Sequence, residues 1–341
     1  MILKHILKEV KMKNNHKKIL ITGGAGYVGA VLVPELIKKG YKVTVLDLMI
    51  YGEEVIKKNS NITMVKGDIR DQDLLKKLIP GHNVVIHLAC ISNDPSFELN
   101  PKLGKSINLD AFEPLVKISK NSGVERFIYA SSSSVYGVKK EDNVDEGMSL
   151  EPLTDYSKFK ASCEVILGKY LSEEFTTVTL RPATVCGYSP RQRFDLVVNI
   201  LTNLAFHKRE ISVFGGSQLR PNIHIADMVN AYICIIESPK EKISGQIFNV
   251  GGENHSVLEL ANIVQKIAGE DVKLVLTETD DNRSYHISSS KIYNTLGFKP
   301  IHTIEQASNE LKIALESGLL PASLDDEKYF NIKVMQLLNL E

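Results

Sequence analysis

The feature that most constrains the fold is a regular alternation of short apolar runs with amphipathic stretches along the first half of the chain. Each run is only a few residues long and is rich in Val, Ile, Leu and Thr. The runs cover residues 17–22, 41–47, 61–67, 83–89, 126–131 and 176–182. Short buried strands that alternate with helices are typical of βαβ units, so the sequence predicts an α/β fold with a doubly wound parallel sheet. Such sheets bind ligands beyond the carboxyl ends of their strands.

The alternation becomes irregular from about Tyr188 onward, which indicates a smaller second lobe interleaved with the first. In this part we expect short strands at 210–216 and 246–252, and helices at 227–237, 256–268 and 303–317. The predicted divisions are a basic extension (1–17), a dinucleotide-binding lobe (18–187), a substrate-binding lobe (188–321) and a tail helix (322–341). In the tail, Phe330, Val334, Leu337 and Leu338 have the spacing of one helix face, and packing or dimerisation is its expected role.

The composition argues against nucleic acid and membrane partners. Lys and Arg together number 41, and so do Asp and Glu, so there is no overall basic field to attract a polyanion. In residues 1–17, lysines interrupt the apolar pairs, which argues against a secretory or membrane-spanning segment. The four cysteines include no C-x-x-C pair, which is typical of reduced thiols in a cytoplasmic protein and predicts no structural metal.

A glycine-rich turn follows the first predicted strand. The segment from Thr22 to Gly29 reads TGGAGYVG and opens a helix that ends near Gly40. Glycines let the backbone approach a pyrophosphate, and the helix N-terminus supplies free N–H groups and a positive dipole end. Asp47 closes the second strand, where a carboxylate accepts hydrogen bonds from an adenosine ribose and repels a 2′-phosphate. The sequence therefore predicts NAD as the cofactor in preference to NADP.

A serine cluster and a Y-x-x-x-K pair form a second constellation. Ser132 follows the fifth predicted strand, and Tyr156 and Lys160 lie four residues apart at the start of a helix. Residues four apart share a helix face, so the Lys160 ammonium can stabilise the phenolate of Tyr156. An unperturbed tyrosine, with a pKa of roughly 10, needs such help to act as a base at neutral pH. We expect Ser132, Tyr156 and Lys160 to be the catalytic residues.

These motifs and their order resemble the extended short-chain dehydrogenase/reductase family of nucleotide-sugar epimerases and dehydratases, from about Lys18 to Pro300. The family resemblance implies a Rossmann-type sheet, NAD and a homodimer. It also implies that Asp68 and Ile69 flank the adenine and that Lys160 holds the nicotinamide ribose. The cofactor-binding residues expected from the motifs and this resemblance are Gly23, Gly26, Tyr27, Val28, Gly29, Asp47, Asp68, Ile69, Leu88, Ala89, Asn108, Tyr156 and Lys160.

The substrate implied by the resemblance is a nucleotide-diphosphate sugar, linked to UDP, GDP or dTDP. Arg220 resembles the family element that contacts the nucleotide, and Arg283 the later arginine that clamps its phosphates. The full set of expected substrate-binding residues is Ser92, Ser133, Asn199, Arg220 and Arg283. Arg191 and Arg193 form a further basic cluster at the start of a predicted helix, with no role fixed by the family pattern. The chain departs from that pattern at Cys90, Asp155 and Thr184.

The mechanism implied by the resemblance is removal of the C4 hydroxyl proton by Tyr156 while the C4 hydride passes to NAD. The outcome is either 4-epimerisation or release of a 4-keto sugar. Ser133 and Ser134 stand where the dehydratase branch has an Asp-Glu pair, so we expect no 4,6-dehydration. Two alternatives remain, a reductase of small carbonyl compounds and a non-catalytic dinucleotide sensor.

Overall fold

The computed structural model describes residues 17–92, 94–141, 143–279 and 284–338. Its largest element is a seven-stranded sheet in the order β10-β6-β5-β4-β1-β2-β3, and each of its strand pairs is parallel. The strands are β1 (Lys18–Thr22), β2 (Lys42–Asp47), β3 (Ile62–Lys66), β4 (Val84–His87), β5 (Arg126–Ala130), β6 (Thr176–Pro182) and β10 (Gln246–Val250). The predicted α/β fold with a doubly wound parallel sheet is thereby confirmed.

The register of this sheet brings the ends of its strands to one edge. Thr22 pairs with Leu46 on one side and with His87 on the other, and His87 pairs in turn with Tyr129. The Thr22 hydroxyl and the His87 Nδ1 lie 2.7 Å apart. The loops after β1, β2, β4 and β5 therefore begin side by side at the carboxyl edge of the sheet.

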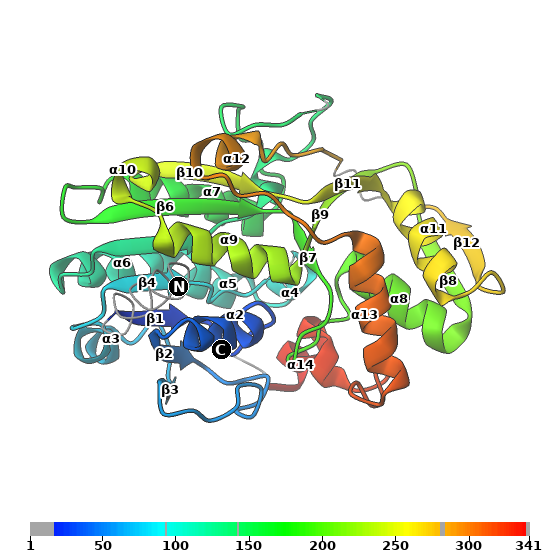
Figure 1. Ribbon diagram of the computed structural model, residues 1–341, viewed down its shortest axis with the longest axis horizontal. Helices are drawn as coiled ribbons and strands as arrows, with labels where there is room; N and C mark the ends of the chain where they lie inside the picture. Colours follow the sequence, from blue (N-terminus) through cyan, green and yellow to red (C-terminus); the bar gives the residue numbers. More distant parts are fainter. Residues whose placement is uncertain (1–16, 93, 142, 280–283, 339–341) are drawn as a thin grey trace, which may run out of the picture.

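Helices cover both faces of the sheet, and a separate hydrophobic core fills each interface (Figure 1). On one face lie α2 (Gly29–Lys38) and α9 (Ile225–Glu237), which contact each other. The other face carries α3 (Gln72–Leu78), α6 (Phe112–Asn121) and α7 (Asp155–Gly168). Shorter elements are α4 (Asp94–Leu99), α5 (Pro101–Lys105), η1 (Ser106–Asp110), η2 (Ser133–Tyr136), α10 (Lys240–Ile243) and α12 (Ser290–Leu296).

The smaller lobe lies beyond the carboxyl edge of the main sheet (Figure 1). It contains a three-stranded sheet, a two-stranded sheet and three helices that pack on one another. These elements are β7 (Thr184–Cys186), β9 (Leu219–His224), β11 (Glu253–Ser256), β8 (Glu210–Phe214), β12 (Lys273–Thr277), α8 (Val197–Lys208), α11 (Val257–Ala268) and α13 (Ile304–Glu316). The predicted helices at 256–268 and 303–317 correspond to α11 and α13 of this lobe, whereas the helix predicted at 227–237 is α9, which packs on the main sheet.

The strand expected at 246–252 belongs to the main sheet and not to the smaller lobe. It forms β10, which pairs with β6 in parallel and buries Phe248 and Val250 completely. The prediction was wrong because a short apolar run carries no signal for the sheet that it joins. The chain thus returns to the large sheet after building part of the smaller lobe.

The tail contains η3 (Glu327–Tyr329) and α14 (Asn331–Leu338), and α14 packs against α4. The expected apolar face is only partly correct. Val334 is buried as predicted, but the Leu337 and Leu338 side chains are 64% and 46% exposed. The buried side of α14 instead carries Asn331 and Met335, because it faces the cavity described below. Among the described helices, none is long and apolar enough to cross a membrane.

Candidate active site

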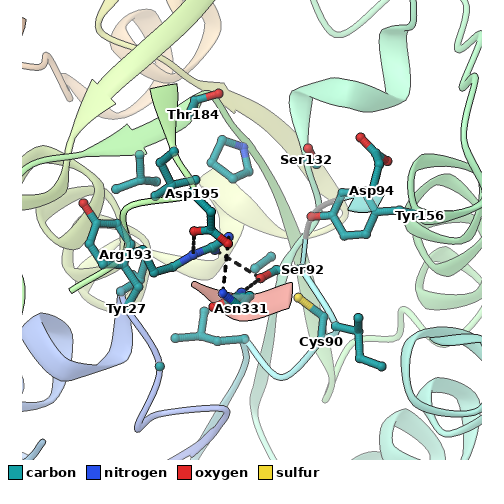
Figure 2. Close-up of a pocket in the computed structure, with 18 of the residues that line it drawn as sticks. Tyr27, Cys90, Ser92, Asp94, Ser132, Tyr156, Thr184, Arg193, Asp195 and Asn331 are labelled. Atoms are coloured by element: carbon teal, nitrogen blue, oxygen red, sulfur yellow. Dashed lines mark hydrogen bonds and ion pairs between the residues drawn. The ribbon is translucent and has the colours of Figure 1, made fainter. Parts of the chain in front are cut away.

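A cavity of about 740 Å³ lies at the carboxyl edge of the main sheet. The loops after β1, β2, β4, β5 and β6 line one side of it, and residues of the smaller lobe such as Phe214 and Arg220 line the other. Its volume is typical of a pocket for a ligand of cofactor or substrate size. Figure 2 shows the part of the cavity where Tyr156, Ser132, Arg193 and Asn331 come together.

The glycine turn after β1 forms the floor of this cavity. At Gly23, whose φ is +74°, an added Cβ would lie 2.4 Å from the backbone nitrogen of Ala89. At Gly29 it would lie 2.2 Å from the carbonyl oxygen of Gly24. A side chain at either position would therefore separate β1 from the end of β4, or displace the start of α2. Among the described residues, no side chain caps the N-terminus of α2, and the positive end of the helix dipole there suits an anion.

Asp47 lies beside the turn, at the end of β2. Its Oδ2 accepts a hydrogen bond from the Ala25 amide at 2.9 Å, and its Oδ1 accepts one from the Met49 amide at 2.9 Å. Burial raises the pKa of Asp47, and these two amides partly offset that effect. Each carboxylate oxygen can still accept a further hydrogen bond. The carboxylate lines the cavity and suits the two hydroxyls of a ribose.

Most residues predicted to bind the cofactor line this same cavity. They are Gly23, Gly26, Tyr27, Val28, Gly29, Asp47, Asp68, Ile69, Leu88, Ala89, Tyr156 and Lys160. Asp68 forms an ion pair with Arg70 at 2.7 Å, which together with hydrogen bonds outweighs the effect of burial and lowers the pKa of Asp68. The structure therefore brings together groups that fit a dinucleotide: a glycine turn, a helix N-terminus without a side-chain cap and a carboxylate at the end of the second strand.

Asn108 is the exception among the predicted cofactor-binding residues. Its side chain is absent from the cavity lining, because its amide is used by the loop after β4. The Asn108 Oδ1 accepts a hydrogen bond from the Ile91 amide at 2.8 Å, and its Nδ2 donates to the Ile91 carbonyl at 2.9 Å. The π-helical turn η1 supplies this residue, and such turns often occur next to functional sites. Asn108 thus holds the loop after β4 in place from outside the cavity lining.

Tyr156 and Lys160 are positioned by the first turns of α7. Thr154 caps this helix, accepting a hydrogen bond from the Ser157 amide in a reciprocal capping box. Both side chains line the cavity, and the Tyr156 hydroxyl points toward Ser132 (Figure 2). The Ser132 Oγ also accepts a hydrogen bond from the Ser134 amide at 3.1 Å and opens η2. The three predicted catalytic residues are thereby brought together.

The electrostatic environment of Tyr156 opposes ionisation in the absence of ligands. Burial raises the pKa of Tyr156 well above its usual range, and Cys90 and Asp94 raise it further. Arg193 and the Ser132 hydroxyl lower it. The Lys160 ammonium donates a hydrogen bond to the Ala130 carbonyl at 2.6 Å and lies 5.8 Å from the centre of the Tyr156 ring.

A buried polar network supports the serine cluster from beneath. Ser131 donates a hydrogen bond to Glu164 at 2.5 Å, and Glu164 forms an ion pair with Arg181 at 2.6 Å. Arg181 also donates to the Tyr136 hydroxyl at 2.8 Å, which donates in turn to Asn249 on β10 at 2.7 Å. The network therefore ties the ends of β5, β6 and β10 to α7, and it fixes the backbone that carries Ser132.

A second polar cluster stands opposite Tyr156 across the cavity (Figure 2). Arg193 forms an ion pair with Asp195 at 2.8 Å and donates to Ser92 Oγ at 3.1 Å. Asn331 on α14 donates its side-chain amide to Ser92 Oγ at 2.9 Å and its backbone amide to Asp195 at 3.2 Å. Sequence reasoning had left Arg193 without a role and had not identified Asn331 at all.

The other expected substrate-binding residues differ in whether they line the cavity. Ser133 and Arg220 line the cavity with Ser92, whereas Arg283 lies outside the described residues. Asn199 is fully buried behind the lining, where it accepts a hydrogen bond from the Gly187 amide at 3.0 Å and donates to the Tyr27 hydroxyl at 3.1 Å. The expectation that Asn199 contacts substrate is therefore not met, because its amide already joins the two lobes.

Arg191 and Arg193 do not begin a helix as expected. They lie in the loop between β7 and α8, which starts only at Val197, and both are buried and line the cavity. The sequence carries no signal for this burial, because arginine is mostly exposed and SPRQRFD is largely polar.

Comparison with known proteins places this arrangement in a family. Residues 19–251 match the family described as NAD dependent epimerase/dehydratase. An uncharacterized UDP-glucose epimerase of Bacillus subtilis is 32% identical over 75% of this chain and 84% of its own length. Mouse dTDP-D-glucose 4,6-dehydratase is 27% identical over 83% of this chain and 84% of its own length. The crystal structure of Thermotoga maritima UDP-glucose 4-epimerase with UDP-glucose superposes with a TM-score of 0.81 at 26% identity, covering 89% of this chain and 99% of the epimerase.

Proposed function

Because this chain belongs to the NAD-dependent epimerase/dehydratase family, we propose that it oxidises the C4 hydroxyl of a nucleotide-activated sugar. If the hydride returns to the opposite face of C4, the product is the C4 epimer, and if it does not, the product is a free 4-keto sugar. Neither route includes 4,6-dehydration. NAD is the cofactor of the family, and the residues around the glycine turn and Asp47 fit it. UDP-, dTDP- and GDP-linked sugars are the candidate substrates, and relatives of this chain are named UDP-glucose 4-epimerase and dTDP-D-glucose 4,6-dehydratase.

The observation that carries this proposal is the position of the Tyr156 hydroxyl, beside Ser132 in the same cavity as the glycine turn. Tyr156, as the phenolate, takes the proton from the C4 hydroxyl, and Ser132 hydrogen-bonds the same oxygen. Bound NAD supplies the acceptor for the hydride that leaves C4. The sugar thus loses two electrons and two hydrogens, one as a proton to Tyr156 and one as hydride.

Cations near Tyr156 are needed for this step because burial raises the pKa of its hydroxyl. Lys160 shares the helix face of Tyr156 and lines the cavity, so its ammonium favours the phenolate as well as the cofactor ribose. Arg193, on the opposite wall, lowers the pKa of Tyr156 in the same sense. Proton removal by Tyr156 therefore rests on charge contributed from both sides of the cavity.

The acid–base groups that the described residues place around Tyr156 argue against 4,6-dehydration. That reaction needs an acid to expel the C6 hydroxyl and a base to remove the C5 proton. Ser133 lies 3.3 Å from the Tyr285 hydroxyl and Ser134 donates to Ser132 at 2.8 Å, and neither hydroxyl titrates near neutral pH. Asp155 is exposed and pairs with Lys158, outside the cavity lining.

Asp94 is the carboxylate that lines the cavity close to Tyr156. The Thr154 hydroxyl donates a hydrogen bond to its Oδ1 at 2.5 Å. Asp47 and Asp68 flank the cofactor region of the lining, and Asp195 is paired with Arg193. Among the described residues, Asp94 is therefore the one carboxylate near Tyr156 that belongs neither to the cofactor region nor to the Arg193 pair. Dehydration would need both an acid and a base, which supports a reaction that ends at C4.

The test is a reaction in deuterated water with a panel of UDP-, dTDP- and GDP-sugars, analysed by mass spectrometry and NMR. We expect a C4 epimer or a 4-keto sugar that keeps its C6 oxygen. The Tyr156→Phe variant serves as the matched control, since it lacks only the phenolic oxygen. A 6-deoxy product with solvent deuterium at C5 would contradict the proposal.

A further inference from the structure

The guanidinium of Arg191 is buried with an incomplete set of partners. Its residue is 3% exposed, and its Cζ lies 3.5 Å from the centre of the Tyr51 ring. One terminal nitrogen, Nη2, donates to the Asn331 Oδ1 at 2.5 Å, whereas Nε has no hydrogen-bond partner among the described residues. Within the described ranges, no carboxylate forms an ion pair with it. A buried charge in this state is costly, and it indicates that a negatively charged ligand completes the site.

The loop that carries Arg191 is fastened to the glycine turn. The Tyr27 hydroxyl donates to the Gly187 carbonyl at 2.6 Å, and the Ser189 hydroxyl donates to the Tyr27 carbonyl at 2.8 Å. The Ser189 Oγ also accepts a hydrogen bond from the Arg191 amide at 3.3 Å. Arg191 is therefore held on the side of the cavity where α2 begins.

The charged surroundings of Arg191 point to the same end of the cavity. Burial lowers the pKa of Arg191 to about 10, and the negative charges of Asp47 and Asp195 act against that effect. Tyr51, which stacks on the guanidinium, belongs to the connection that follows Asp47. The N-terminus of α2, the Asp47 carboxylate and the Arg191 Nε thus lie at the end of the cavity that suits the diphosphate of a dinucleotide, next to its adenosine ribose.

We propose that Arg191 binds the diphosphate of NAD, and that Tyr51 and Asn331 are positioning residues that hold its guanidinium. The planar fork of arginine suits phosphate oxygens, and its Nε completes a hydrogen bond that the protein leaves unmade. Asn331 also contacts Ser92, so α14 is joined to both the cofactor and the opposite wall of the cavity. This inference depends on the cofactor of the family and is independent of the C4 chemistry proposed above.

The experiment compares the binding of ADP, adenosine and UDP by ligand-observed NMR titration, in the original protein and in Arg191→Gln. Because hydrogen bonds to charged groups are worth several-fold to a hundredfold in affinity, we expect ADP binding to weaken about 10- to 100-fold. Adenosine and UDP should bind as before. An equal change for ADP and adenosine, or no change for ADP, would overturn the proposal in favour of a structural role. A loss confined to UDP would assign Arg191 to the diphosphate of the substrate instead.

Two further variants keep the test decisive. Arg191→Lys retains the charge without the fork, so it should bind ADP with intermediate affinity and keep a salt dependence that Arg191→Gln loses. If Arg191→Gln does not fold, as judged by circular dichroism, Arg191→Lys carries the comparison, and unchanged ADP affinity there would overturn the proposal. Arg209→Gln is the matched control, because Arg209 pairs with Asp271 outside the cavity and should leave all three affinities unchanged.

Discussion

The buried pair of Glu164 and Arg181 allows a quantitative prediction about the support of the serine cluster. Both side chains are 4% exposed, and Arg181 donates to Glu164 through Nε and Nη2. Glu164→Gln keeps the size and shape of the side chain but removes its charge. The Arg181 guanidinium then stays buried without a counter-ion, and Ser131 loses a charged acceptor.

Breaking one partner of a buried ion pair typically costs about 3–5 kcal/mol of unfolding free energy. Unfolding entropy near the midpoint is about 2.1 cal/mol/K per residue, so in a chain of 341 residues this loss lowers Tm by about 4–7 °C. The same change should loosen the backbone that carries Ser132, so turnover should fall while NAD affinity stays near the original value.

Differential scanning calorimetry of the two proteins at one pH measures the shift directly. Glu113→Gln is a suitable control, because Glu113 is exposed and its carboxylate accepts a hydrogen bond from the neutral hydroxyl of Tyr170, just beyond the end of α7, at 2.9 Å. It should change Tm by less than about 1 °C. Equal shifts in the two variants would refute the reasoning that burial makes the Glu164 pair strong.

The remaining predictions concern the cofactor, the base and pH. Calorimetry should show tighter binding of NAD than of NADP, because the Asp47 carboxylate repels a 2′-phosphate, and comparable affinities would contradict this role. Tyr156→Phe should abolish hydride transfer while NAD affinity is retained, so near-normal turnover would remove Tyr156 from the mechanism. Burial lowers the pKa of His87 to about 3 from its ordinary 6.5, so the unfolded chain binds more protons than the native protein between these values. The free energy of unfolding should therefore fall as pH drops from 6.5 toward 3, and it should fall less steeply in His87→Gln. Urea titrations at several pH values measure this dependence, and equal slopes in the two proteins would contradict the prediction.

The sequence predicts those parts of the fold and site that depend on local order along the chain. The strands that precede Gly23 and end at Asp47 could be identified because each turn, helix and strand follows directly in sequence. Tyr156 and Lys160 share a face by helix geometry alone. Their convergence with the glycine turn follows from the parallel sheet, whose strand ends meet at one edge.

What the sequence did not predict depends on contacts between distant residues. Asn331 meets Ser92 across 239 positions of the chain, and the side chain of Asn199 meets Tyr27 across 172. Nothing in the neighbourhood of an asparagine distinguishes one that contacts a ligand from one that braces a loop. The family resemblance places Asn108 at the cofactor, and Asn199 is expected at the substrate, but the amides of both are used by the protein itself.

The position of β10 has a consequence for how the protein is made. During synthesis, β6 emerges roughly sixty residues before the strand that pairs with its outer side. At about 5–20 residues per second, β6 therefore spends some seconds as an unprotected edge, open to pairing with other chains. A fragment that ends near residue 187 would keep that edge permanently, so it should aggregate even though it contains the glycine turn and the reactive tyrosine. The autonomous folding unit of this protein accordingly extends at least to Val250, past much of the smaller lobe.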